Sequence, residues 1–236
     1  MNIKGKTALV TGASRGLGYA LADLLARRGA NLVIAARHLD ELEAAKRELE
    51  SHADVVAIAA DVSENAEDVV AAGIKRFATI DILINNASEL GPSPMPMLAD
   101  LPWQAMERIL RVNVTAALHL TQLVLPGMRS RGAGTIVNIS SDAGANAYPG
   151  WGGYGASKAA LEHMSRVLAA ELDGSGIRIL TIDPGDMDTQ MHRDAIPDAD
   201  PSELRDPADS ARALLRAIAT MKERYERVRL ADLVPA

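Results

Sequence analysis

A glycine-rich turn near the N-terminus constrains the fold more than any other stretch. Its glycines follow the pattern Gly-x-x-x-Gly-x-Gly over residues 12–18. The apolar run 7–10 precedes the turn, a helical pattern over 19–28 follows it, and a second apolar run occupies 32–36. Strand, glycine turn, helix and strand form the first unit of a dinucleotide-binding fold, because the helix N-terminus there offers free N–H groups to phosphates. The stretch predicts a nucleotide site at the end of the first strand.

The rest of the chain repeats the alternation of strands and helices. Further strands are expected at 55–60, 81–84, 135–139, 177–182 and 228–230, and further helices at 39–51, 65–77, 103–128, 154–172 and 209–222. Such alternation predicts a parallel sheet with helices on both faces. With no internal repeat or linker, we expect residues 1–236 to form a single-domain α/β fold, a Rossmann-type doubly wound sheet of about seven strands. The polar segment 186–207 is expected to form a lid over the site.

Composition excludes several classes of partner. The net charge of −6 argues against a nucleic-acid or anionic-membrane partner. The chain has no cysteine, and no partner cluster supports a metal ion at His192, so no metal is predicted. The N-terminus lacks the apolar core of a signal peptide, and no run of about eighteen uncharged apolar residues occurs. We therefore expect a soluble cytoplasmic protein.

The end of the second predicted strand decides between NAD and NADP. Enzymes for NAD usually carry an acid there for the ribose 2′-hydroxyl. Here residues 35–38 read Ala-Ala-Arg-His, and the first acid is Asp40. The Arg37 guanidinium can bind a 2′-phosphate through paired hydrogen bonds, and Arg15 in the glycine turn is a second candidate. The alternative is that both arginines are ordinary surface residues. We favour NADP.

Tyr154 and Lys158 are the candidate catalytic pair. Positions four apart share one face of a helix, and an ammonium beside a phenol lowers the pKa of the phenol. A tyrosine tuned in this way can exchange a proton with a substrate oxygen near neutral pH. The spacing also occurs by chance on many helices, so a solvated pair is the alternative.

Polar residues at other points of the pattern are further candidates. Asp61 and Val62 end the third predicted strand, and Asn85 and Asn86 follow the fourth, at the sheet edge where ligands bind. The asparagines either make a turn, contact a ribose or brace neighbouring strands. Asn113 lies inside an apolar helix, where asparagine is a poor helix former. Taken by itself, Asn113 is best interpreted as a buried amide whose hydrogen bonds are made by other protein groups.

Together the motifs resemble the short-chain dehydrogenase/reductase family. They occur in that family's order and cover the chain from residue 7 to about 190: Thr11-Gly12-x-x-x-Gly16-x-Gly18, Asp61, Asn85-Asn86-Ala87, Asn113, Ser141, Tyr154-x-x-x-Lys158 and Pro184-Gly185. The nearest branch looks like the NADP-dependent carbonyl and 3-oxoacyl reductases.

The resemblance implies a role for each candidate catalytic residue. Tyr154 would protonate the carbonyl oxygen, and Lys158 would lower its pKa and bind the nicotinamide ribose. Ser141 would hold the substrate oxygen, with Ser140 as the competing candidate. Asn113 would hold a water that links Lys158 to solvent.

The resemblance also implies the binding residues and the reaction. The cofactor would contact Gly12, Ser14, Arg15, Gly16, Leu17, Gly18, Arg37, Asp61, Val62, Asn86, Ala87, Tyr154, Lys158, Pro184, Gly185, Met187 and Thr189. The substrate would contact Ser141, Tyr148, Trp151 and His192. The expected activity is NADP(H)-dependent hydride transfer between nicotinamide and a carbonyl or secondary alcohol, with a small to medium apolar ketone or aldehyde as substrate. The alternative is a non-enzymatic NADP-binding regulator of the same fold.

The sequence departs from the family pattern at three places. Ser88 stands where glycine is usual and is expected to narrow the nicotinamide side of the pocket. Asp186 and Asp188 make the start of the lid acidic. The C-terminus lacks the glycine-rich ending of tetrameric members, so we expect a homodimer or homotetramer built on the helices 103–128 and 154–172.

Overall fold

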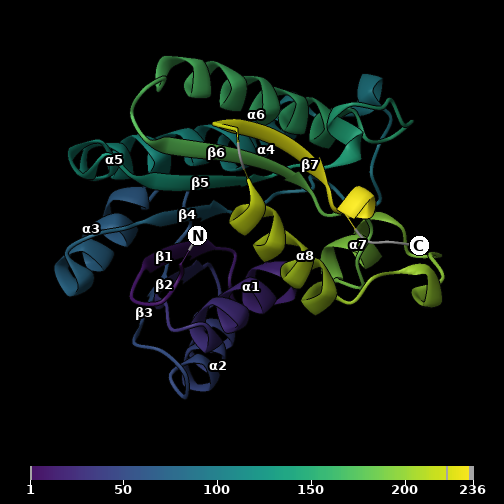
Figure 1. Ribbon diagram of the computed structural model, residues 1–236. Coiled ribbons are helices and arrows are strands. Elements are labelled where there is room, and N and C mark those ends of the chain that lie inside the picture. The colour runs from purple at the N-terminus through teal and green to yellow at the C-terminus, as the bar shows by residue number, and fades with distance from the viewer. Residues whose placement is uncertain (1, 222, 234–236) are drawn as a thin grey trace.

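The computed structural model describes residues 2–221 and 223–233. At its centre is a seven-stranded sheet in the order β3-β2-β1-β4-β5-β6-β7, with every neighbouring pair parallel (Figure 1). The strands are β1 (Thr7–Thr11), β2 (Asn31–Ala36), β3 (Val55–Ala59), β4 (Ile82–Asn85), β5 (Gly134–Ile139), β6 (Ile177–Asp183) and β7 (Tyr225–Arg229). The expected Rossmann-type doubly wound α/β fold is confirmed.

Helices cover both faces of the sheet because its strands are apolar on both sides. Along β1, Ala8 and Val10 pack with α1 (Gly16–Arg27), α2 (Leu39–Leu49) and α8 (Pro207–Thr220). Leu9 points to the other face and packs with α3 (Ala66–Phe77) and α5 (Ala116–Arg131). Successive strand residues point to opposite faces, so one strand supplies both cores.

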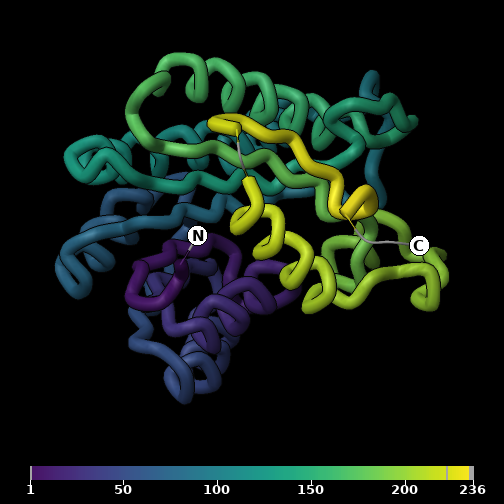
Figure 2. The backbone as a smooth tube through the Cα atoms, in the orientation of Figure 1, coloured from purple at the N-terminus to yellow at the C-terminus, as the bar shows by residue number. Residues whose placement is uncertain are grey.

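Figure 2 traces how the chain builds the sheet from its centre outward. The purple and blue N-terminal part carries β1 to β3 toward one edge, and the green and yellow C-terminal part carries β5 to β7 toward the other. The strand order therefore reverses between β1 and β4. Ligands of open α/β sheets bind at such a reversal, outside the carboxyl ends of the strands.

The helix predicted at 103–128 differs from the observed one in two ways. It consists of α4 (Trp103–Leu110), a π-helical turn at Arg111–Thr115 and α5, which ends at Arg131. The helix stops there because Gly132 adopts a left-handed φ of 61°. The π-turn contains Asn113, and π-turns are frequent at functional sites.

The run Trp103–Arg131 is long and apolar enough to cross a membrane by length and composition. Half of its most apolar window is buried within the protein. Its α5 part packs against α3 and the sheet, which accounts for the apolar residues in the manner of a core helix.

The other predicted boundaries shift by a few residues. The first helix begins at Gly16 rather than residue 19, and the predicted helix 154–172 is α6 (Gly152–Glu171). Helix α8 begins at Pro207 because the Asp206 side chain accepts from the Ala208 N–H and caps it. Its predicted end at residue 222 lies outside the described residues. The strand predicted at 228–230 is the longer β7.

The segment expected to form a lid has little regular structure. It holds one short helix, α7 (Gln190–Ala195), capped by the Thr189 hydroxyl, and a 3-10 turn at Pro201–Glu203. Met187 forms a bridge with Arg205, so the two ends of the segment lie together. Figure 1 shows α7 at the end of the sheet where β7 finishes.

Candidate active site

A cleft of about 590 Å³ opens along the carboxyl edge of the sheet. Most residues predicted to contact cofactor or substrate line it: Gly12, Ser14, Arg15, Gly16, Leu17, Arg37, Asp61, Val62, Asn86, Ala87, Ser141, Trp151, Tyr154, Lys158, Pro184, Gly185, Met187, Thr189 and His192. Gly18, Asn113 and Tyr148 do not line this cleft.

The glycine turn lies at one end of the cleft. Gly12 has a φ of 65°, and a Cβ on Gly18 would lie 2.2 Å from the Gly12 carbonyl oxygen. Gly18 therefore serves close packing of α1 against the turn, whereas Gly12 gives the turn its shape. Arg15 precedes α1 without a side-chain cap, so the first N–H groups of the helix are free to bind an anion. This arrangement fits the diphosphate of a dinucleotide.

Asn86 braces the glycine turn. Its Nδ2 donates to the carbonyl oxygens of Thr11 at 2.8 Å and Gly12 at 3.1 Å. The Thr11 hydroxyl in turn accepts from the N–H groups of Asn86 and Ala87. Of the alternatives open from the sequence, bracing of neighbouring strands is the one observed.

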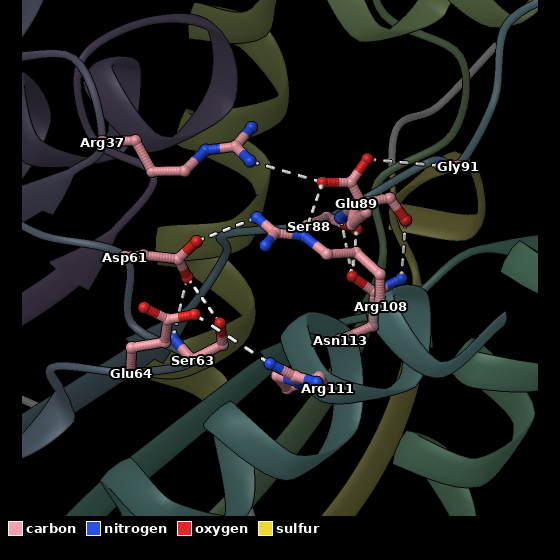
Figure 3. A network of polar contacts seen from close by, with 10 residues as sticks. All are labelled: Arg37, Asp61, Ser63, Glu64, Ser88, Glu89, Gly91, Arg108, Arg111 and Asn113. Carbon is pink, nitrogen blue, oxygen red and sulfur yellow. Dashed lines mark hydrogen bonds and ion pairs between the residues drawn. The ribbon is translucent and has the colours of Figure 1, made fainter. Parts of the chain in front are cut away.

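Four charged residues form a chain of ion pairs at the nucleotide end of the cleft (Figure 3). Arg37 Nη1 lies 3.3 Å from Glu89 Oε2, and Arg108 Nη2 lies 2.9 Å from Asp61 Oδ2. Arg108 Nε lies 3.8 Å from the same Glu89 oxygen and joins the two pairs. Burial alone would raise the pKa of Asp61, but hydrogen bonds from Ser63 and the charge of Arg108 hold it below its ordinary value. Asp61 is therefore ionised at neutral pH.

Lys158 lies at the bottom of the cleft and is 2% exposed. Its ammonium donates to the Ile139 carbonyl at 2.8 Å and lies 5.2 Å from the centre of the Tyr154 ring. Burial lowers the pKa of Lys158 to about 8.

The Tyr154 hydroxyl faces two serines. Burial raises the pKa of Tyr154 to about 12, while the hydroxyls of Ser88 and Ser141 oppose the rise and the charges of Asp183 and Asp142 add to it. The net direction is upward, opposite to the lowering expected from Lys158, because burial is the largest influence on the hydroxyl. The neighbours that lower the pKa of this hydroxyl are the two serines.

The structure separates Ser140 from Ser141. The Ser140 hydroxyl donates to buried Glu162 Oε1 at 2.7 Å, and Glu162 Oε2 accepts from Arg227 Nε at 2.9 Å. Ser141 lies on the cleft wall, where its Oγ donates to Asp142 and accepts from the Ala143 N–H. Ser140 also lines the cleft, but its hydroxyl is bonded to buried Glu162, whereas the Ser141 hydroxyl faces that of Tyr154.

The Asn113 amide is saturated by protein groups. Its Nδ2 donates to the Glu89 carbonyl at 2.9 Å and to Ser157 Oγ at 2.8 Å. Its Oδ1 accepts from the Glu89 N–H at 2.7 Å and from Ser88 Oγ at 3.2 Å. Asn113 thus clamps residues 88–89, and its amide has no position left for a water.

The substrate candidates divide between two hollows. Trp151 packs edge-on against Tyr154 with ring centres 5.8 Å apart, at the junction of the cleft and a groove of about 380 Å³. Tyr148 lies in that groove and donates to Asp142 at 2.7 Å. His192 Nδ1 lies 3.6 Å from Asp186 in the cleft.

Over residues 2–221 and 223–233, no group of three or more His, Asp or Glu side chains gathers to hold a metal.

Several residues of the site were not predicted as site residues, among them Glu89, Asp183 and Ser88. Glu89 carried no signal, because it begins an irregular loop rich in proline and methionine. Asp183 was read only as a strand end, yet it lines the cleft, and burial raises its pKa. Ser88 was recognised as a departure from the family pattern, which was the one available signal.

Comparison with known proteins decides the family. The model of the short chain dehydrogenase family matches residues 6–200. The chain belongs to the short-chain dehydrogenase family. It is therefore an oxidoreductase that transfers hydride between a nicotinamide cofactor and a small-molecule substrate, and members of this family are commonly oligomeric.

Individual short-chain dehydrogenases resemble the chain over most of its length. Glycine betaine reductase of Emericella nidulans is 37% identical over 227 residues, which cover 92% of the chain and 18% of that much longer protein. A short chain dehydrogenase from Shigella flexneri complexed with NADP has a TM-score of 0.85 and 28% identity over 98% of both chains. A 7α-hydroxysteroid dehydrogenase complexed with NADH has a TM-score of 0.86 and 28% identity over 97% of this chain and 94% of that one.

Proposed function

We propose that the protein is an NADP(H)-dependent carbonyl reductase. The observation that carries the proposal is the Tyr154 hydroxyl, which faces Ser141 in a cleft whose other end is an anion-binding glycine turn. Phenol and serine hydroxyl together can bind and protonate one carbonyl oxygen. The bound nicotinamide supplies the hydride.

The chain's own residues divide the remaining work. Tyr154 donates the proton to the substrate oxygen, and Ser141 holds that oxygen through a hydrogen bond. Lys158 would bind the nicotinamide ribose. We further propose that the proton is replaced through a water held near Asn113, whose side-chain amide is itself saturated by protein groups.

Preference for NADP rests on the end of β2. Arg37 lines the cleft directly after that strand, and Arg15, within the glycine turn, lines the cleft as well. The Shigella flexneri relative supports this assignment through its NADP complex, whereas the hydroxysteroid dehydrogenase was solved with NADH. The absence of an acid before Asp40 decides our choice.

The proposed substrate is a small to medium apolar ketone or aldehyde. Trp151 supplies an apolar surface beside Tyr154, while His192 and Ser141 supply polar groups in the same cleft. We further propose a soluble cytoplasmic enzyme that forms a homodimer or homotetramer through the α4–α5 run and α6.

The alternative is a regulator that binds NADP without turning over substrate. It is disfavoured because Ser141, Tyr154 and Lys158 are all present and meet in one cleft. NADPH oxidation against a panel of ketones, aldehydes, diketones and quinones tests the proposal. Turnover of at least one carbonyl supports it, and tight NADPH binding without any turnover supports the regulator.

A further inference from the structure

The ion pair between Arg37 and Glu89 spans the nucleotide end of the cleft. Arg37 follows β2 and Glu89 begins the loop after β4, and β1 lies between these strands. The two side chains therefore meet above the carboxyl end of β1, where the glycine turn begins. Both residues line the cleft, and Figure 3 shows them reaching toward each other from opposite sides.

Glu89 is held more firmly than Arg37. The Asn113 amide bonds both its N–H and its carbonyl, Oε1 accepts from the Gly91 N–H at 3.4 Å, and Arg108 flanks Oε2. Its side chain is 21% exposed, against 49% for Arg37. If Arg37 turns away, Glu89 keeps both Arg108 and the Gly91 N–H as partners.

We propose that Glu89 is a specificity-determining residue that competes with the cofactor's 2′-phosphate for Arg37. This inference rests on the proposed NADP preference. A carboxylate on Arg37 occupies the guanidinium donors that would otherwise bind phosphate oxygens. To bind, NADP(H) must break the Arg37–Glu89 ion pair so that Arg37 can pair with the 2′-phosphate. NAD(H) has no 2′-phosphate and does not need Arg37. Glu89 therefore weakens NADP(H) binding and leaves NAD(H) binding unchanged.

The size of the effect follows from the exposure of the pair. Ion pairs between exposed side chains contribute about 0.2–1 kcal/mol, which corresponds to a change of about 1.4- to fivefold in a binding constant. Glu89 is less exposed than a typical surface carboxylate, so we expect the upper part of this range. Arg15 pairs with Glu41 at 3.5 Å, but both of these side chains are more exposed than Glu89.

Glu89→Gln tests the charge while keeping the shape and the hydrogen-bonding capacity of the side chain. NADPH and NADH dissociation constants are measured by nicotinamide fluorescence at one fixed salt concentration, without substrate. We expect NADPH to bind about two- to fivefold more tightly to the variant and NADH to bind unchanged. Glu64→Gln is the matched control, because Glu64 pairs with Arg111 at 3.9 Å outside the cleft and should change neither constant.

The same substitution in an Arg37→Gln background separates this inference from the proposed function. If Glu89 acts through Arg37, Glu89→Gln has no effect on NADPH binding there. An equal effect in both backgrounds, an unchanged NADPH constant, or an equal change for NADH overturns the inference. If Arg37→Gln alone leaves the ratio of the NADPH and NADH dissociation constants unaltered, the assignment of NADP as the preferred cofactor fails as well. If Arg37→Gln weakens NADPH binding relative to NADH binding, but Glu89→Gln in the otherwise wild-type protein leaves the NADPH constant unchanged, only the role of Glu89 is overturned.

Discussion

The Lys158 ammonium lies over the face of the Tyr154 ring, 5.2 Å from its centre, and is bonded to the Ile139 carbonyl. Lys158 is buried, whereas Tyr154 is partly exposed to the cleft. Burial acts on both groups in the direction of their neutral forms, raising the pKa of Tyr154 and lowering that of Lys158. A neutral tyrosine is the form that a general acid needs.

Tyr154→Phe removes the proposed proton donor and little else. We expect carbonyl turnover to fall by about 10²- to 10⁴-fold, while the NADPH dissociation constant stays within about twofold of wild type, because the ring and its packing on Trp151 remain. Single-turnover kinetics and a fluorescence titration measure the two quantities. Wild-type turnover in this variant contradicts the mechanism.

Lys158→Met should alter how stability depends on pH. The folded-state pKa of about 8 lies below the ordinary lysine value, so between about pH 8 and 10 the unfolded chain binds more protons than the folded one. Stability of the wild type therefore gains a contribution of about 2 kcal/mol as pH rises through that window. Urea denaturation at pH 8 and 10 should show this gain in the wild type and not in Lys158→Met. Equal pH dependence in both proteins contradicts the buried ammonium.

Ser88→Gly restores the residue usual in the family and removes a hydroxyl that lowers the pKa of Tyr154. Alcohol oxidation needs the deprotonated tyrosine, so its rate rises with pH through that pKa. Loss of Ser88 raises the pKa of Tyr154 and so moves the rising part of the pH–rate profile to higher pH. We therefore expect slower oxidation than in the wild type at pH 8–10. Ser51→Gly, at the exposed end of α2, is the control and should leave the profile in place. A profile in Ser88→Gly that superimposes on wild type excludes the contact.

Arg37→Asp places an acid at the end of β2 and removes the proposed phosphate partner. NADPH binding should weaken by about 10- to 100-fold, because a hydrogen-bonded charge contributes about 1.5–3 kcal/mol. NADH binding should stay the same or improve. Arg47→Asp makes the same charge change on the exposed side of α2 and should leave the ratio of the two constants intact. If Arg37→Asp also leaves it intact, Arg37 does not select the cofactor.

Glu162→Ala tests the buried contact that occupies Ser140. Removing the carboxylate leaves the Arg227 guanidinium and the Ser140 hydroxyl without their partner. We expect the free energy of unfolding to fall by about 3 kcal/mol, since breaking one side of a buried pair leaves a charge uncompensated. Urea denaturation at neutral pH measures the change. A loss below about 0.5 kcal/mol, the size of an ordinary surface substitution, contradicts the structural role.

The family and the order of the elements were predictable from the sequence because they depend on local patterns. The glycine turn needs residues 12–18 in a given order, and a separation of four residues places Tyr154 and Lys158 on one helix face in any context. The helix at 103–128 was predicted, but its π-turn was not, because the turn accompanies bonds from Asn113 to distant residues.

What the sequence determined by itself was the doubly wound fold and the list of chemical groups available at its edge. Only the tertiary structure decided how those groups pair: Ser140 with Glu162, Arg37 with Glu89, and Tyr154 with Ser88 and Ser141. It also decided the direction of the Tyr154 pKa shift. The physical reason is that burial and ion pairing depend on segments far apart in the chain, whereas strand alternation and helix spacing depend on neighbours.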